Sequence, residues 1–316
     1  MIKFKLYFIL LIASIALFSC HKDDAVAPPR DRSQQYSSDI DSIEKYLHNH
    51  YIKHVTVNGE PDVEIDSIPA GGSQTSIWDN TEFPLQFKIV KNDVRKTYSV
   101  DGKSDDAVEY KMYYLVINQG GGQKPTTIDS TFTSYKGWTL NDNVFDARDT
   151  PLWSTYPANP KINEIALISG YRQFLPELKT ATASAIGEDG SVTFTNSGVG
   201  IVFIPSGLGY FDVAKPFIGP YSPLVFKIML QSLRYRDHDR DGILAKDEIY
   251  NGETDYFNQD TDKDNIPDFL DIDDDGDGYS TLFEIQENGV KVFPYPTCDS
   301  GIPKYLDKTC HPAKKQ

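Results

Sequence analysis

The chain has 316 residues, of which 39% are hydrophobic and 12% aromatic, enough to bury a sizeable core in about two domains. Its net charge of −15 is concentrated in residues 237–284, where 17 acidic and three basic residues leave a net charge of −14. Because the rest of the chain is close to neutral, the composition excludes the basic footprint of a nucleic-acid-binding protein.

The first 20 residues, MIKFKLYFILLIASIALFSC, are predicted to be a targeting segment. Lys3 and Lys5 precede an apolar stretch, residues 6–17, that is too short to span a membrane comfortably as a helix. The stretch ends in Leu-Phe-Ser-Cys20, which resembles the lipobox of bacterial lipoproteins. This resemblance implies cleavage before Cys20 and lipidation of its sulfur, which would attach the protein to a membrane. The alternative is an ordinary signal peptide with a chance cysteine.

Residues 21–37 are predicted to form a tether between the lipid and the folded part, because they are polar and contain Pro28-Pro29. The tether begins with HKDD, which resembles the export tag of some Gram-negative outer-membrane lipoproteins. We therefore expect an outer-membrane lipoprotein that faces the periplasm or the cell surface.

Residues 38–108 are predicted to contain a helix and short strands. Residues 39–54 have apolar side chains at helical spacing, and Ser38 or Asp39 is available as a cap. This amphipathic helix could cover a sheet or support a dimer. Residues 55–86 have apolar side chains at alternate positions, interrupted by Gly and Pro, which predicts short strands. Residues 92–107 are too polar for a core and are predicted to form a loop.

Residues 109–236 have a sustained β pattern in which five segments follow a defined order. The first is INQGGGQKPTTIDSTFTSYKGW, which contains Tyr135 and Gly137. The second is Phe145-Asp146, which begins ten residues after Tyr135. LISGYRQFLPEL, IPSGLGYF and IGPYSPLVFKIML complete the series. In this order, the segments resemble the domain of FKBP-type peptidyl-prolyl cis-trans isomerases. The resemblance implies an α+β fold in which an antiparallel sheet wraps on a short helix.

The resemblance also implies a set of site residues. An apolar pocket would be formed by Tyr135, Phe145, Ile168, Phe226 and, as its floor, Tyr171. The Tyr210 hydroxyl and the backbone N–H of Ile168 would hold substrate carbonyls, and Asp146 would orient Tyr135 by a hydrogen bond. The chain departs from the family with Tyr171 in place of Trp, Leu152 in place of Phe, Phe211 in place of Gly, and an insertion over residues 181–197.

This set of residues suits the chemistry of prolyl isomerisation. Rotation about an X–Pro bond meets a barrier of about 20 kcal/mol because the amide is conjugated, and it needs no proton transfer, nucleophile or cofactor. A dry apolar pocket favours the twisted amide, and a donor holds the carbonyl. The expected partners are proline-containing polypeptides. Two alternatives stay open: the aromatic residues are ordinary core, or the protein is a non-catalytic polypeptide-binding, adhesion or assembly lipoprotein.

Residues 237–290 contain three copies of a twelve-residue calcium-loop pattern, in which carboxylates at positions 1, 3 and 5 are followed by a backbone carbonyl at 7 and a carboxylate at 12. The predicted ligands are Asp237, Asp239, Asp241, Ile243 and Glu248; Asp260, Asp262, Asp264, Ile266 and Asp271; and Asp273, Asp275, Asp277, Tyr279 and Glu284. The alternation of copy starts, 23 and then 13 residues apart, resembles thrombospondin type 3 repeats more than paired EF-hands.

We expect structural Ca²⁺ in this segment, with an affinity of about 10⁻⁴ to 10⁻³ M, as in extracellular modules. Without a cation, the concentrated negative charge would drive the segment apart. The alternative is a disordered acidic run.

Residues 291–316 contain Cys298 and Cys310, which we predict to form a disulfide outside the cytoplasm. A zinc site is the alternative, but only His311 is near enough in sequence to add a ligand.

Overall fold

The structure is a computed structural model that describes residues 28–57, 60–93, 106–250 and 252–310. The predicted signal peptide, the lipidation site at Cys20 and the start of the tether lie outside these ranges. Within them, no helix combines the length and the apolar character needed to cross a membrane.

The N-terminal helix differs from its prediction at both ends. Helix α2 spans Arg32–Asn49, and strand β1 (His50–Val57) follows directly and pairs antiparallel with β2 (Glu60–Ser67). The predicted tether is thus helical from residue 32, because Tyr36 and Ile40 extend the face that packs on the β domain. Residues 50–54, predicted as helix, form a strand instead because they continue into Val55, Thr56 and Val57, which favour strand, and pair with β2.

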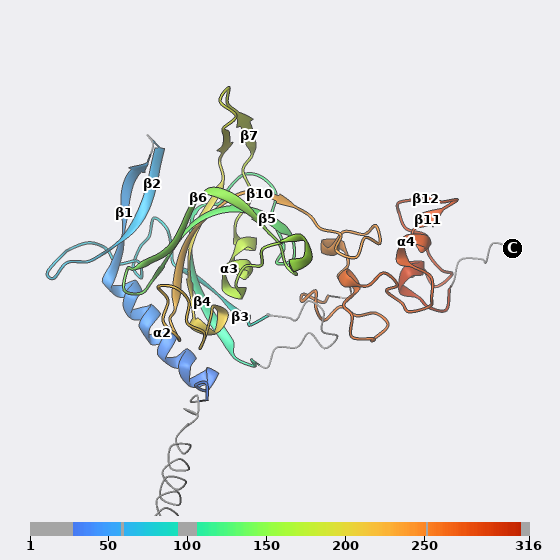
Figure 1. Cartoon of the computed structure of the whole chain (residues 1–316), viewed down its shortest axis with the longest axis horizontal. Coiled ribbons are helices and arrows are strands. Elements are labelled where there is room, and N and C mark those ends of the chain that lie inside the picture. The colour runs from blue at the N-terminus through green and yellow to red at the C-terminus, as the bar shows by residue number, and fades with distance from the viewer. Residues whose placement is uncertain (1–27, 58–59, 94–105, 251, 311–316) are drawn as a thin grey trace, which may run out of the picture. The chain divides into compact units, whose positions relative to one another are not determined.

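The centre of the fold is a six-stranded antiparallel sheet in the order β3-β4-β9-β10-β5-β6 (Figure 1). Its strands are β3 (Gln86–Lys91), β4 (Glu109–Asn118), β5 (Ser130–Thr139), β6 (Val144–Ser154), β9 (Gly198–Ile204) and β10 (Leu224–Arg234). One short helix, α3 (Ser169–Phe174), packs against the sheet, as expected for an α+β fold.

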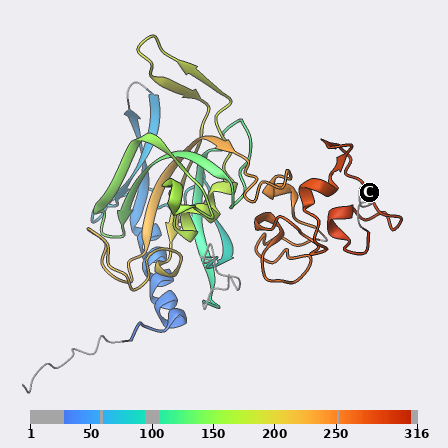
Figure 2. The same ribbon diagram turned by 45° about the vertical axis from the view of Figure 1, so that its right-hand side comes forward.

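Smaller elements complete the described chain. The insertion at residues 181–197 forms a hairpin of β7 (Ala183–Ile186) and β8 (Val192–Thr195). The acidic segment contains two 3-10 turns, η4 (Ala245–Asp247) and η5 (Asp268–Leu270), and the short α-helix α4 (Thr281–Glu284). A minimal hairpin of β11 (Gln286–Glu287) and β12 (Val290–Lys291) follows (Figure 2).

The sheet separates two hydrophobic cores because successive strand residues face opposite sides. In β10, Phe226 and Ile228 face the core that contains α3, whereas Val225 faces the core that contains α2. Ile43 and Leu47 of α2 are fully buried, and each such side chain stabilises the fold by about 1.5–3 kcal/mol. Helix α2 therefore covers the face of the sheet opposite α3.

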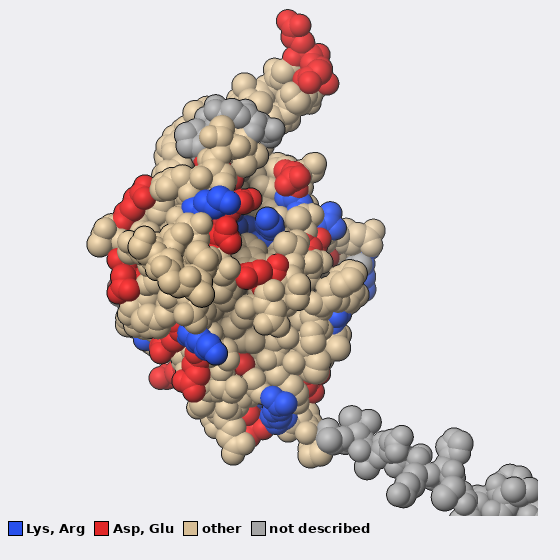
Figure 3. Space-filling model, turned by 90° about the vertical axis from the view of Figure 1, so that its left-hand side faces the viewer, with Lys and Arg blue, Asp and Glu red and all other residues tan. Residues whose placement is uncertain are grey.

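The hairpin β1–β2 lies over the same face as α2 and leaves a groove with a volume of 630 Å³. Lys227 links β10 to this hairpin: its ammonium pairs with Asp62 and donates to the carbonyl of Val63 at 2.8 Å. Figure 3 shows this side of the molecule, where acidic and basic side chains are interspersed on a largely uncharged surface.

Candidate functional site

Four aromatic rings from four different elements meet on the α3 side of the sheet. They are Tyr135 of β5, Phe145 of β6, Tyr171 of α3 and Phe226 of β10. The Phe226 ring is the centre, with ring centroids 5.8 Å from Tyr135, 5.4 Å from Phe145 and 5.3 Å from Tyr171, all edge-to-face. Edge-to-face pairs favour each other beyond simple burial, so the rings form a packed aromatic cluster. Tyr171 and Phe226 are its inner rings, 1% and 5% exposed, and Tyr135 and Phe145 are partly buried at its outside.

Gly137 lets these rings approach the sheet. It lies opposite Phe226 on β10 and opposite Asp146 on β6. A Cβ atom at this position would lie 2.6 Å from the Phe145 ring and 2.8 Å from the Phe226 ring, far inside van der Waals contact. The glycine two residues after Tyr135 is thus required by the packing of the aromatic group.

The polar atoms of the group are held by short hydrogen bonds. Tyr135 donates to Asp146 at 2.6 Å, and Tyr171 donates to Thr133 at 3.0 Å. Burial, then the hydrogen bond to Asp146, raises the pKa of Tyr135 to about 12, and burial also raises the pKa of Tyr171. Both hydroxyls are neutral at physiological pH and serve as donors, not as bases.

Ile168 and Tyr210 lie at the border of the same core. Ile168 is extended (φ −61°, ψ 153°) just before α3, and no hydrogen bond among the described residues uses its backbone N–H. Tyr210 follows the short helix η3 (Ser206–Leu208), and burial, then the negative charge of Asp146, raises its pKa. The structure thus gathers all seven predicted site residues around one aromatic cluster, with Ile168 and Tyr210 at its border and Asp146 bonded to Tyr135.

The 630 Å³ groove is a separate feature. It lies on the opposite face of the sheet and shares only Tyr135 with the seven pocket residues. We place the candidate site on the α3 face because the aromatic group and the edge donors are there.

The three acidic loops have one backbone conformation in common. We refer to residues 237–248, 260–271 and 273–284 as the first, second and third loops. In each, the fourth and sixth residues have a left-handed backbone, with φ between 66° and 99°: Arg240 and Gly242, Lys263 and Asn265, Gly276 and Gly278. In each, the sixth backbone N–H donates to the first carboxylate and the seventh to the fifth. Three loops of different sequence thus fold in the same way.

This conformation brings the predicted carboxylate ligands together. The first three carboxylates of each loop offer oxygens within 4.8 Å of one another. The carboxylates predicted at position 12 are close to them: burial, then neighbouring carboxylates, raises the pKa of Glu248 to about 11 and of Glu284 to about 8. For Asp271 the same burial, opposed in part by a hydrogen bond from Asp273, gives a pKa of about 6.

Buried oxygens without a hydrogen-bond partner test whether these residues fit a cation. In the first loop they belong to Asp237, Asp239, Asp241 and Glu248, and in the third loop to Asp273, Asp274, Asp275 and Glu284. Buried carboxylates are costly unless they are paired or bind a metal. Clustered carboxylates with a backbone carbonyl are the donor set of Ca²⁺, so the first and third loops fit this ion. The second loop is more exposed and has no such orphaned oxygen among its described atoms.

Sequence reasoning missed Asp274, the second residue of the third loop. Its side chain is buried with both oxygens unpaired, and its carboxylate lies within 4.8 Å of Asp241 and Glu248, two predicted ligands of the first loop. The sequence offered one signal: the second position of the loop is a carboxylate only at Asp274, whereas the first loop has His238 there and the second has Thr261.

The C-terminal residues pack on the acidic loops. The predicted disulfide is confirmed between Cys298 and Cys310, whose Cα atoms are 5.9 Å apart. Tyr305, within the disulfide loop, forms a buried cluster with Ile243 of the first loop and Ile285. The predicted boundary between residues 290 and 291 therefore divides a single packed cluster.

Comparison with known proteins supports the resemblance of the β domain. The chain is 29% identical over 127 residues to "Peptidyl-prolyl cis-trans isomerase Mip" of Coxiella burnetii, which covers 39% of this chain and 45% of that protein. Part of the chain is homologous to FKBP-type peptidyl-prolyl isomerases. The chain spans less than half the length of this relative, so the homology describes the FKBP-like domain and not the whole protein.

Two solved structures are also similar in part. A peptidyl-prolyl cis-trans isomerase of Pseudomonas syringae is 23% identical, with 39% of this chain and 74% of that chain covered and a TM-score of 0.30. FkpA of Escherichia coli is 25% identical, with 39% and 48% covered and a TM-score of 0.30. Residues 238–305 match a family described as "BamM C-terminal", which runs from the first acidic loop into the disulfide loop.

Proposed function

We propose that this protein is an FKBP-type peptidyl-prolyl cis-trans isomerase that assists the folding of cell-envelope or surface proteins. The observation that carries the proposal is the aromatic group around Phe226, with the Tyr210 hydroxyl and the Ile168 N–H at its border. A prolyl ring would rest on this apolar surface, and the two donors would hold the carbonyls beside it.

The mechanism would depend on the shape and dryness of the site. The twisted amide has less charge separation than the planar amide, so an apolar surface favours it over the ground state. Asp146 would fix the orientation of Tyr135 through their 2.6 Å hydrogen bond and would not remove a proton. No cofactor enters this chemistry.

The proposal includes a membrane anchor and a calcium-stabilised extension. Cys20 would bear a lipid that holds the protein in the outer membrane, facing the periplasm or the cell surface. A Cys20→Ser variant should then move from the membrane fraction to the soluble fraction of the envelope. The acidic loops would bind structural Ca²⁺, for which the orphaned buried oxygens are the support.

A direct test is the cis-to-trans conversion of a proline-containing tetrapeptide by the chain from residue 21 onward. We expect a rate above the uncatalysed background, and a loss of roughly tenfold or more in kcat/KM for the Phe145→Ala, Tyr210→Phe double variant. Phe293→Ala removes a ring that is 85% exposed and lies outside the site, so it should leave the rate unchanged. A wild-type rate equal to background would reject the enzyme.

A non-catalytic polypeptide-binding protein is the second candidate. It is favoured by exposed apolar side chains on the two segments next to the site, Ile162 and Ile165 before α3, and Val213 and Phe217 after Tyr210. Such a surface could hold a client segment without turnover. Binding of a proline peptide without any acceleration of its isomerisation would select this candidate.

A further inference from the structure

The third acidic loop contributes a side chain to the ion site of the first loop. We propose that Asp274 is a ligand of the calcium ion held by the first loop, so that one ion joins two loops whose nearest ligands, Glu248 and Asp274, are 26 residues apart in the sequence. This inference rests on the calcium binding proposed above and is independent of the isomerase activity.

The contact is made by three buried carboxylates. Asp241, Glu248 and Asp274 offer oxygens within 4.8 Å of one another, and the residues are 2%, 1% and 1% exposed. Both oxygens of Glu248, both of Asp274 and one of Asp241 have no hydrogen-bond partner. Buried anions in this number need a cation between them, because breaking or omitting such a pairing costs several kcal/mol.

The orientation of Asp274 follows from its place in the loop. The second side chain does not join the carboxylates at positions 1, 3 and 5 in the other two copies. His238 binds the carbonyl of Ile128, outside its loop, at 2.9 Å, and Thr261 donates to Asp268, at position 9 of its own loop, at 2.7 Å. Asp274 likewise leaves the site of its own loop to Asp273, Asp275 and Asp277. Its backbone N–H donates to the fully buried Thr281 at 3.2 Å, which fixes its position.

The first loop lacks one ligand that Asp274 can replace. Position 9 of a calcium loop commonly supplies an oxygen directly or through water, and the third loop has Thr281 there. The first loop has Ala245, which is fully buried in an apolar cluster with Ile128 and Phe269. Three aspartates, the Ile243 carbonyl and a bidentate Glu248 give six oxygens, and Asp274 raises the set to seven, within the six to eight that Ca²⁺ takes.

The arrangement makes the first ion a cross-link of the C-terminal segment. The ligands come from both ends of residues 237–284, and the first loop alone would hold this ion with one oxygen fewer and a lower affinity. Calcium binding at the first loop should therefore order the third loop as well, and the segment should fold as a unit.

Calcium stoichiometry measured by equilibrium dialysis tests this inference on the chain from residue 21 onward. Glu248→Gln removes the bidentate ligand of the first loop and should cost one bound ion. Asp274→Asn should cost the same ion, with an affinity loss of about tenfold or more for that site. In the double variant no second ion should be lost. Asp247→Asn, an exposed neighbour of Glu248 that pairs with Lys246, is the matched control and should bind as the wild type does.

Three results would overturn the inference. Wild-type binding by Asp274→Asn would show that the loops act separately. Loss of two ions in the double variant would place Asp274 at another site. A wild-type chain that binds no calcium would remove the calcium role itself, whatever the isomerase assay gives.

Asp274→Asn removes a buried charge, so the variant should keep the circular dichroism of the wild type in chelator. Hydrogen exchange supplies a second readout: calcium should protect residues 237–248 in the wild type but not in Asp274→Asn. Equal protection in both would contradict the proposal.

Discussion

Gly137 sets the depth of the candidate site because it is the point where two rings rest on the sheet backbone. Any side chain there must displace Phe145 or Phe226, whose rings also pack on each other, with their centroids 5.4 Å apart. Since the rings come from β6 and β10, a displacement would spread to strands on both sides of β5.

Gly137→Ala should therefore damage both the site and the fold. Overpacking of this kind costs about 1–3 kcal/mol in the free energy of unfolding, which urea denaturation would measure. The rate of isomerisation should fall even under conditions in which the variant is fully folded, because the displaced rings form the prolyl surface. The control is Gly219→Ala, where the nearest atom to a new Cβ is 3.6 Å away. Equal stability and activity for both variants would contradict the assigned packing.

The tyrosine hydroxyls predict how pH affects the protein. The pKa of Tyr135 rises from its ordinary 10.0 to about 12 in the folded state, so folding favours the protonated form. Its contribution to stability is complete below pH 10.0 and is lost as the pH rises toward about 12. The isomerisation rate should be flat from about pH 6 to about pH 9, because no proton transfer is involved. A bell-shaped profile in that range would indicate acid–base catalysis.

Single residues could be predicted where a motif fixes both type and spacing. The Tyr135–Asp146 pair and the aromatic group follow from the family order of segments. The backbone of Phe211 could not be predicted: it adopts φ 49°, a left-handed conformation, where the family has glycine, and its ring is buried against Tyr221. Asp274 was missed because its partner lies in another loop, and spacing within one loop does not reveal such a contact.

Helix α2 fixes the segment that carries Tyr210. Asp39 is 1% exposed and accepts hydrogen bonds from the backbone N–H of Ser206 at 2.7 Å and from its hydroxyl at 2.6 Å. Ser206 begins η3, four residues before Tyr210. An element outside the predicted FKBP-like domain thus holds part of the candidate site.

Asp39→Ala should reveal this support. The change leaves two buried donors of Ser206 without their acceptor, and hydrogen bonds to a charged group contribute about 1.5–3 kcal/mol each. We expect the free energy of unfolding to fall by about 3 kcal/mol and KM for a proline peptide to rise. Asp41→Ala, an exposed position on the same helix, should change neither. Similar effects of the two variants would remove the proposed support.

At the scale of elements, the sequence was informative where periodicity dominates. The β pattern in residues 109–236 predicted β4, β5, β9 and β10 but not the two edge strands, β3 and β6. The apolar spacing of residues 39–54 predicted a helix near its true place. The ends of α2 were wrong because tertiary contacts decide them: Tyr36 extends the helix by accepting a hydrogen bond from the N–H of Lys111, and β2 draws residues 50–54 into a hairpin. The face that α2 covers is a property of packing, which one sequence does not state.

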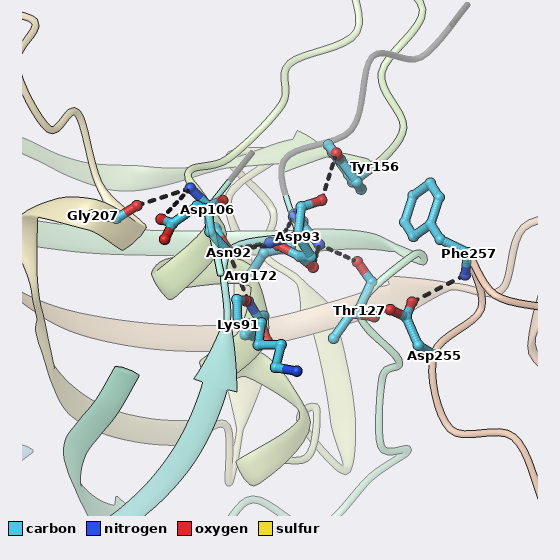
Figure 4. A network of polar contacts seen from close by, with 12 residues as sticks. Lys91, Asn92, Asp93, Asp106, Thr127, Tyr156, Arg172, Gly207, Asp255 and Phe257 are labelled. Atoms are coloured by element: carbon cyan, nitrogen blue, oxygen red, sulfur yellow. Dashed lines mark hydrogen bonds and ion pairs between the residues drawn. The ribbon is translucent and has the colours of Figure 1, made fainter. Parts of the chain in front are cut away.

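In the whole molecule, the acidic segment reaches the pocket helix α3 through Tyr156, which lies between them. Arg172 of α3 forms a two-pronged ion pair with Asp93 at 2.7 and 2.8 Å, and its guanidinium stacks on Tyr156 at 3.6 Å (Figure 4). The ring of Tyr156 in turn packs edge-to-face with Phe257 of the acidic segment, with the two ring centroids 5.8 Å apart. Since Tyr171 precedes Arg172, order in the acidic segment supports the helix that holds the floor of the site.

Calcium should therefore stabilise the molecule. At about 10 mM Ca²⁺ and a Kd of about 10⁻⁴ to 10⁻³ M, each site would add about 1.4–2.7 kcal/mol. Thermal melting with calcium and with chelator measures the effect. Phe257→Ala should melt in two steps in chelator, because the contact with Tyr156 is weakened. Superimposable wild-type curves in the two conditions would exclude a structural ion.

The most direct test of the assigned isomerase site is the rate of exchange between the cis and trans forms of a proline peptide. NMR measures this rate in the presence of the chain from residue 21 onward. The aromatic group predicts exchange faster than in the free peptide, with wild-type rates kept by Phe293→Ala and lost in the Phe145→Ala, Tyr210→Phe double variant. Exchange at the rate of the free peptide, or equal acceleration by the wild type and the double variant, would contradict the assignment of the site.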